Sequence, residues 1–294
     1  MRLSGTLDYS LAACNRATCV VRACCPRNNN SRGTRLSSAA MKLERKKSLR
    51  ALLLGAALPL AIAAFAHPPA ESLLPFRIGE TLNYQVQWSA FASAAAVQLT
   101  IPERRDLFGS RTWHFRASAH TLSPLRAFLT VNDQFDSYAD AATLESRQYE
   151  MYLDEMGQKE TEVLRLVPIG QSRRGNGAGV AVLPGTLDPL AALYALRGVD
   201  WQHQTEFRAP LYDGHDVYQM IAARQVPSET VAVAAGNFSA TRLSIELFEP
   251  GKDAPESTFS VWLARDPAHT PILVEAELPL GNVRAELTST SAAR

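Results

Sequence analysis

Leu82-Asn83-Tyr84-Gln85-Val86-Gln87-Trp88-Ser89 alternates apolar and polar side chains without interruption. Because successive side chains of a strand point to opposite faces, this alternation predicts a strand with one buried face and one wet face. The same period recurs downstream, as at Trp113 and Phe115 or along Leu243–Leu247 and Phe259–Leu263. Turn signals such as Asp213-Gly214 separate the runs at short intervals. The chain is therefore expected to form about ten to twelve strands joined as antiparallel hairpins.

A sheet with this many strands does not stay flat, because strand twist accumulates until the sheet curls or closes. The expected fold is mainly β: a strongly curved antiparallel sheet or an incompletely closed β-barrel. The stretch 67–294 contains all of the predicted strands and is long enough for one β-rich domain.

One segment, Thr186–Gly198, departs from the strand pattern and predicts a helix. Asp188 is suited to cap its first turn, Pro189 to begin it and Gly198 to end it. Helical spacing places Leu190, Leu193, Tyr194 and Arg197 on one face. We expect this face to pack on the concave side of the sheet. A shorter helical turn is expected after Ser123-Pro124, and a loop is expected over Gln171–Gly185.

The stretch Met41–Ala66 has a basic head, an apolar run over Ala51–Phe65 and a small-x-small end. These features are typical of a secretory signal peptide cleaved after Ala66. Residues 1–40 are then interpreted as translated upstream sequence, with the true start at Met41. The competing interpretation is a cytoplasmic extension ahead of a signal anchor. The apolar run is about 15 residues, shorter than the roughly 20 that span a bilayer.

All four cysteines (Cys14, Cys19, Cys24 and Cys25) precede Met41, so the mature chain would have no disulfide, thiolate metal site or cysteine nucleophile. His67 follows the expected cleavage site, where a bacterial lipoprotein would have cysteine. Residues 67–294 contain 19 basic and 27 acidic side chains, a net charge of −8. An acidic chain without a basic run is a poor nucleic-acid binder. We expect a periplasmic protein that is neither a lipoprotein nor integral to the membrane.

Four groups of residues resemble, in order, the bacterial domain of unknown function 3108 family. They are Gly79-Glu80-x-Leu82-x-Tyr84-x-Val86-x-Trp88, the helix from Asp188-Pro189-Leu190 to Leu196-Arg197, Glu229-x-Val231 with Gly236-x-Phe238, and Trp262-Leu263-x-x-Asp266 with Pro271. The resemblance covers residue 75 to about 290. It implies an exported envelope protein with a β-rich, incompletely closed barrel, similar in shape to periplasmic lipid carriers, and it implies no activity. Ala90 and Ala94 stand where the family usually has turn glycines.

No motif in the sequence assembles a catalytic or metal centre. Asp213-Gly214-His215-Asp216 is the densest polar cluster, and it is interpreted as a hairpin turn rather than an acid–base site. His114 and His120 share the polar side of one strand and would need a distant third ligand to bind a metal. The chain has neither a Gly-x-Ser-x-Gly elbow nor a Walker loop. We therefore predict a non-enzymatic protein without cofactor or metal.

Five aromatic residues are expected at inward strand positions, and two further candidates come from the helix. The ligand-binding candidates are Tyr84, Trp88, Trp113, Phe115, Tyr194, Arg197 and Trp262. Two interpretations stay open for the aromatic residues: an ordinary core, or a cavity under the helix for a lipid-like ligand. Arg197 is suited either to structural pairing at the helix end or to recognition of an acidic head group.

The function expected from these features is binding or carriage of an apolar or amphipathic ligand in the periplasm. The alternative is a structural or assembly factor of the cell envelope that acts through contacts with a partner protein. An integral outer-membrane barrel is less consistent with the sequence, because a helix interrupts the strands and paired aromatic girdles are missing. A hydrolase would need a convergent polar site that sequence motifs do not indicate.

Overall fold

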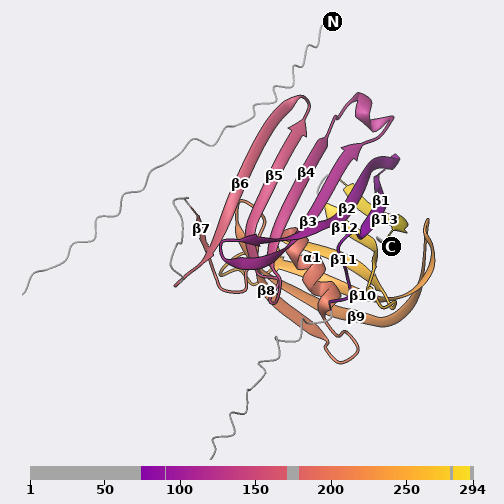
Figure 1. The fold of residues 1–294 in the computed structure, drawn as a ribbon. Helices are drawn as coiled ribbons and strands as arrows, with labels where there is room; N and C mark the ends of the chain where they lie inside the picture. The colour runs from indigo at the N-terminus through magenta and orange to yellow at the C-terminus, as the bar shows by residue number, and fades with distance from the viewer. Residues whose placement is uncertain (1–73, 90, 171–178, 279–280, 292–294) are drawn as a thin grey trace, which may run out of the picture. The chain divides into compact units, whose positions relative to one another are not determined.

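The computed structural model describes residues 74–89, 91–170, 179–278 and 281–291 (Figure 1). These residues form mostly strand, with one α-helix, α1 (Pro189–Gly198), and one 3-10 turn at Leu125–Ala127. The strands are β1 Thr81–Trp88, β2 Phe91–Leu107, β3 Ser110–Thr121, β4 Asn132–Asp140, β5 Ser146–Glu155, β6 Gln158–Pro168, β7 Val180–Val182, β8 Glu206–Tyr212, β9 Val217–Val233, β10 Gly236–Phe248, β11 Ser257–Ala264, β12 Pro271–Leu278 and β13 Gly281–Ser291.

The strands form a single sheet in the order β7-β6-β5-β4-β3-β2-β1-β13-β12-β11-β10-β9-β8. Every neighbour pair is antiparallel except β6 and β7, which run parallel. β1, the first strand in the sequence, pairs with β13, the last one. The free edges of the sheet are therefore two strands from the middle of the sequence, β7 and β8. The result is the predicted mainly β fold: a nearly closed, barrel-like sheet with one unsealed seam.

The short segment before α1 bridges the seam at one end. Leu187 N donates to Pro210 O at 2.9 Å, and Tyr212 N donates to Leu187 O at 2.9 Å. On the other side, Ser146 N donates to Thr186 O at 3.0 Å. One extended stretch of chain therefore connects the start of β5 with β8, although these two strands are not neighbours in the sheet.

The helix lies within the curve of the sheet, as predicted (Figure 1). Asp188 caps it: its Oδ1 accepts from Leu190 N and Ala191 N, each at 2.9 Å, and Pro189 begins the first turn. The packing extends beyond the predicted face. Ala191 and Leu196 are as inaccessible as Tyr194 and Arg197, because the sheet wraps the helix on several sides. A helix that is apolar nearly all round is a buried helix.

The structure corrects one further expectation and does not describe the residues on which several others rest. The expected loop over Gln171–Gly185 contains β7, a strand that extends the sheet by parallel pairing with β6. The stretch 1–40, the segment 41–66 that was expected to be a signal peptide, the four cysteines and residues 171–178 lie outside the described residues. Within the part of the chain that is described, no helix has the length and apolarity to cross a membrane.

Candidate functional site

Five of the seven predicted ligand-binding residues meet on one side of α1, where they pack against one another. The ring centroids of Phe115 and Tyr194 are 3.9 Å apart with planes at 8°. Phe76 places its ring edge-on against Trp113, Phe115 and Tyr194 at centroid distances of 5.0–5.6 Å. Tyr84 is buried among the same core residues and donates from its hydroxyl to Pro271 O at 2.6 Å. These rings fill the space between α1 and β1–β3.

Arg197 is bonded to protein groups on this same side of the helix. Its Nη1 and Nη2 donate to the two carboxylate oxygens of Glu80 at 2.6 and 2.8 Å. Nε and Nη2 also donate to Ala268 O at 3.2 and 2.9 Å. The Arg197 side chain is 0% exposed. This geometry is the structural pairing that the sequence offered as one of two roles for Arg197.

The two remaining candidates lie apart from this cluster. Trp88 is half-buried near the β1–β2 turn, where its ring lies 6.5 Å from that of Phe91. Trp262 was expected to point inward, and that expectation was wrong. Trp262 pairs with Arg242, so its side chain lies on the opposite face of β11 from Val261. There its Nε1 donates to Glu229 Oε1 at 2.6 Å, and the Arg242 guanidinium lies 5.0 Å from its ring.

A cavity of about 460 Å³ lies on the other side of α1, between the helix and the inner face of β8–β12. We call it the helix–sheet cavity. Its lining is Pro189, Ala192, Leu193, Leu196, Leu211, Asp213, Tyr218, Met220, Ile245, Leu247, Ser257, Phe259, Val261 and Val274. Eleven of these side chains are apolar, and none of the seven predicted ligand-binding residues is among them. The helix thus separates an aromatic core from an apolar cavity.

The lining of the cavity is deeply buried in part and accessible to solvent in part. Leu196 and Met220 are 1% exposed, and Val261 is 4% exposed. The accessible part of the lining is half-buried at Leu193, Asp213, Tyr218, Leu247, Ser257, Phe259 and Val274 and exposed at Pro189. We call Asp213, Tyr218, Leu247 and Ser257, which lie in or next to the segments Asp213–Asp216 and Glu249–Glu256, the cavity mouth. Partial burial raises the pKa of the Tyr218 hydroxyl, and the negative charges of Asp213 and nearby acids act in the same direction.

The turn that supplies Asp213 is the hairpin turn predicted from Asp213-Gly214-His215-Asp216. Asp213 Oδ1 accepts from His215 N and from Asp216 N, each at 2.8 Å. Gly214 has φ of +115°, a conformation that glycine adopts more readily than any other residue. The cluster forms a turn between β8 and β9, and its first residue also lines the cavity.

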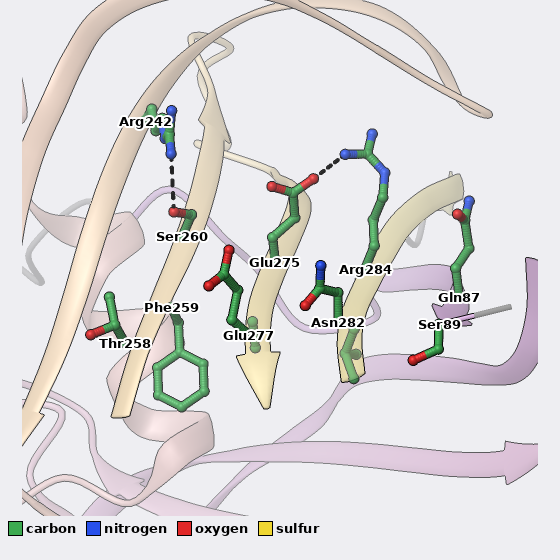
Figure 2. Close-up of a pocket in the computed structure, with 12 residues that line it drawn as sticks. Gln87, Ser89, Arg242, Thr258, Phe259, Ser260, Glu275, Glu277, Asn282 and Arg284 are labelled. Carbon is green, nitrogen blue, oxygen red and sulfur yellow. Dashed lines mark hydrogen bonds and ion pairs between the residues drawn. The ribbon is translucent and has the colours of Figure 1, made fainter. Parts of the chain in front are cut away.

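A larger hollow of about 670 Å³ lies mainly on the outer face of β10–β13, with β1 at its edge (Figure 2). Its side chains are mostly polar, and they alternate along the strands with residues that face the helix. Arg284 pairs with Glu275 and, through Nε, with Glu286 Oε1 at 2.5 Å. Arg242 donates to Ser260 Oγ at 3.5 Å. Most charged side chains of this hollow are thus paired with groups on the same face of the sheet. Such pairing is usual for a solvent-exposed surface.

His114 forms a second buried polar cluster on the outer face of β3 and β4. Its Nε2 lies 2.5 Å from Asp136 Oδ1, and Arg116 Nε donates to the same oxygen at 2.7 Å. Gln134 donates to Asp136 Oδ2 at 2.6 Å. Burial would raise the pKa of Asp136, but these three hydrogen bonds outweigh it and lower the pKa. His120 is exposed and lies outside the cluster.

Part of the lining of the helix–sheet cavity was visible in the sequence as inward strand positions. Leu243, Ile245 and Leu247 follow one another at a period of two, as do Phe259 and Val261. The sequence does not show which inward side chains touch the helix and which leave space beneath it. The choice of aromatic residues as ligand contacts therefore selected the side chains that fill the core.

The fold and cavity define a class: a nearly closed β-sheet barrel with an internal helix and an apolar cavity beside it. The family assignment follows from the sequence itself. Residues 83–288 match the family model described as "Protein of unknown function (DUF3108)". Because the match covers more than half of the chain, this protein belongs to that family, as the resemblance predicted. The chain matches no curated protein.

Solved structures of similar architecture are distant in sequence. A β-barrel-like protein of domain of unknown function DUF1849 from Brucella abortus is 12% identical, with a TM-score of 0.48, covering 74% of this chain and 98% of that one. A candidate exported protein with a YmcC-like fold from Bacteroides fragilis is 13% identical, with a TM-score of 0.34 and coverage of 74% and 98%. A candidate lipoprotein from Parabacteroides distasonis is 10% identical, with a TM-score of 0.33 and coverage of 74% and 97%.

Proposed function

We propose that this protein binds an apolar or amphipathic, lipid-like ligand in the helix–sheet cavity and holds or carries it in the cell envelope. The observation that supports this proposal is the cavity itself: about 460 Å³, apolar at its depth and open at a more polar mouth. Sites for small organic molecules span roughly 300 to 1,000 Å³ and are mostly apolar with a few polar groups. The volume suits one small amphiphile.

The polarity gradient along the cavity supports an amphipathic ligand over a wholly polar one. Leu196, Met220 and Val261 offer only carbon and sulfur surface in the deeply buried part of the lining. Asp213 and Ser257 place oxygen atoms at the mouth. Transfer of an alkyl chain from water to such a surface gains about 25 cal/mol for each Å² that is buried. A chain in the depth with its head at the mouth satisfies both regions.

Binding without catalysis is the proposal that the cavity's chemistry favours. Among the described residues that line it, the polar side chains are those of Asp213, Tyr218 and Ser257. A Ser or Tyr nucleophile needs an adjacent base, and among the described residues no hydrogen bond joins Ser257 or Tyr218 to the Asp213 carboxylate. The periplasmic location belongs to the same proposal, and its support is the signal-peptide pattern at Met41–Ala66.

Uptake of a ligand by delipidated protein tests the proposal. Protein purified from the periplasm would be analysed by native mass spectrometry, which reports bound mass and mature N-terminus together. After organic extraction, it would be titrated with a neutral fluorescent hydrophobic probe. Leu193→Trp places a larger side chain in the cavity from the half-buried helix face and is expected to lower probe affinity about tenfold or more. Leu183→Trp, at a 50% exposed position outside the cavity, is the matched control.

The envelope assembly factor is the alternative function, and one surface feature favours it. Phe128 is 75% exposed and Met156 is 61% exposed. Their two loops are joined, because Met156 N donates to Thr130 O at 2.8 Å and Thr130 N approaches Met156 Sδ at 3.3 Å. Exposed apolar side chains on two joined loops are a feature of protein contact sites. Delipidated protein that takes up no probe would overturn the carrier proposal and leave this alternative.

A further inference from the structure

The mouth of the helix–sheet cavity lies between two short loops. The turn Asp213–Asp216 supplies one mouth residue directly and leads through Val217 to Tyr218. The loop Glu249–Glu256 follows Leu247 after one residue and comes immediately before Ser257. Glu256 N donates to Leu247 O at 2.7 Å, which fixes the end of this loop at the mouth. The side chains of these two loops therefore determine the charge that a ligand head group meets.

Both loops are acidic. The carboxylates are those of Asp213, Asp216, Glu249, Asp253 and Glu256, and the only lysine or arginine in the two loops is Lys252. Lys252 Nζ lies 2.6 Å from Glu249 Oε2 and 4.0 Å from Glu256 Oε2, so its charge is already compensated. The charges of Asp213, Asp216, Glu249 and Glu256 all act on the Tyr218 hydroxyl at the mouth. The net charge around the mouth is negative.

Asp213 is the carboxylate placed to meet the ligand. Its Oδ1 is held by the turn, as described above, and this fixes the orientation of the carboxyl group. Among the described residues, no hydrogen bond is formed by Oδ2, and Asp213 lines the cavity. An ionised carboxylate accepts hydrogen bonds and cannot donate them. A head group that carries N–H or O–H donors is thus complementary to this position.

We infer that the cavity selects amphiphiles whose head group is cationic or a neutral hydrogen-bond donor, and that it discriminates against anionic head groups. This inference rests on the proposed function. An ammonium at Asp213 would form a charge-assisted hydrogen bond, whereas a carboxylate or phosphate would face several like charges across a partly desolvated mouth. Arg197, which the sequence suggested for an acidic head group, is bonded to Glu80 in the aromatic core across the helix.

The test compares three ligands that share one chain and differ in head group: decylammonium, decanol and decanoate. Each would displace a neutral fluorescent probe from delipidated protein, below its aggregation concentration and at low ionic strength. We expect decylammonium to bind about tenfold or more tightly than decanoate, with decanol between them. Because the mouth is partly exposed, the ratio should shrink as salt reduces the Debye length to about 8 Å at 0.15 M.

Charge-neutral variants locate the selectivity. Asp213→Asn combined with Glu249→Gln should reduce the ratio of decylammonium affinity to decanoate affinity several-fold, and decanol affinity should change less than that of either charged ligand. The matched control is Glu160→Gln with Glu162→Gln, an exposed and a half-buried acid on β6 outside the cavity lining. Equal affinity for the three ligands, tighter binding of decanoate, or an unchanged ratio in the double variant would overturn the inference and leave the carrier proposal intact. If no ligand displaces the probe and none binds, the head-group inference and the carrier proposal fail together.

Discussion

Arg197 and Glu80, 117 positions apart in the sequence, form a two-point ion pair that is closed off from solvent. Glu80 immediately precedes β1, and Arg197 lies in the last turn of α1. The same guanidinium reaches Ala268 O in the turn between β11 and β12. One side chain therefore connects the helix end to two segments from opposite ends of the domain. Parallel N–H···O bonds of this kind are geometrically demanding, and lysine does not reproduce them.

Glu80→Gln should destabilise the fold strongly, because it leaves the buried Arg197 charge without its counter-charge. Removing one partner of a buried pair typically costs about 3–5 kcal/mol. The measurement is the free energy of unfolding in urea. Replacing both partners, as Glu80→Leu with Arg197→Met, should recover most of the loss, since apolar substitutes for a buried pair are often neutral.

The matched control for the Glu80 variant is Glu206→Gln, at an ion pair with Arg208 whose two side chains are 44% and 57% exposed. Exposed pairs contribute little to stability, so the urea midpoint of this variant should stay at the wild-type value. Similar losses for Glu80→Gln and Glu206→Gln would contradict the structural role assigned to Arg197.

Asp188 is the second buried anchor of the helix, and its removal should loosen the segment that bridges the seam. Its Oδ2 accepts from Ser137 Oγ and Ser146 Oγ, each at 2.6 Å, and its Oδ1 caps α1. Burial raises the pKa of Asp188, while these four hydrogen bonds act in the opposite direction. Asp188→Ala removes a helix cap and leaves buried donors unpaired, at a combined cost of about 2–4 kcal/mol.

Hydrogen exchange distinguishes this effect from general destabilisation. In Asp188→Ala, the amides of Leu190 and Ala191 should exchange faster than those of β2, relative to the wild type. Asp200→Ala, which removes the exposed carboxylate beside His203, is the control and should leave both sets unchanged. Uniform acceleration across the sheet would mean that Asp188 does not act locally at the helix start.

Acid should weaken the fold in part through Asp136. Because the pKa of Asp136 is lowered in the folded protein, its contribution is fully present above the unfolded value of about 3.9 and is lost as pH falls toward the folded value. Asp136→Asn removes this pH-dependent part. The stability difference between wild type and variant should therefore be constant near neutrality and should narrow below about pH 4.

Urea unfolding at a series of pH values would measure that difference. The control is Asp253→Asn, in the exposed loop between β10 and β11, which measures how removal of an exposed carboxylate changes the free energy of unfolding. The stability difference between wild type and Asp136→Asn would fail to narrow on acidification only if the hydrogen bonds from His114, Arg116 and Gln134 do not lower the pKa of Asp136, and that result would contradict the prediction.

The fold was largely predictable because its signals are local. Alternation identifies strands from single stretches such as Leu82–Ser89, and Asp188-Pro189 begins the helix in a way that depends on neighbouring residues only. The parallel pairing of β7 with β6 was not predictable. It depends on a strand of three residues, whose sequence Val180–Val182 is too short to show a period.

The candidate site was not predictable to the same degree, because it depends on where the helix lies inside the sheet. Trp262 was assigned to the inner face although Val261 and Leu263, its neighbours, carry the inward period. Large aromatic side chains suggested a cavity, yet Phe115 and Tyr194 stack on each other with ring centroids 3.9 Å apart and pack in the core. The cavity lies instead where smaller side chains from five strands face the helix across a wider gap.

Gly214→Ala should test how tightly the seam is packed at the cavity turn. A Cβ at Gly214 would lie 2.7 Å from Met151 Cε and 2.9 Å from Met151 Sδ, and the residue has φ of +115°. The methionine tip is flexible and can move, so backbone strain should dominate, at about 1–3 kcal/mol. Adding Met151→Ala should therefore not remove the cost of Gly214→Ala.

Gly157→Ala is the matched control for this last variant, because Gly157 has φ of +81° and nothing within 4 Å of the added Cβ. Its cost in urea unfolding reports backbone strain alone. A Gly214→Ala cost close to that of Gly157→Ala, and unchanged in the Met151→Ala background, would identify strain as the cause. If Met151→Ala instead abolishes the Gly214→Ala cost, contact across the seam limits this turn, and the seam beside the cavity is packed as tightly as the barrel core.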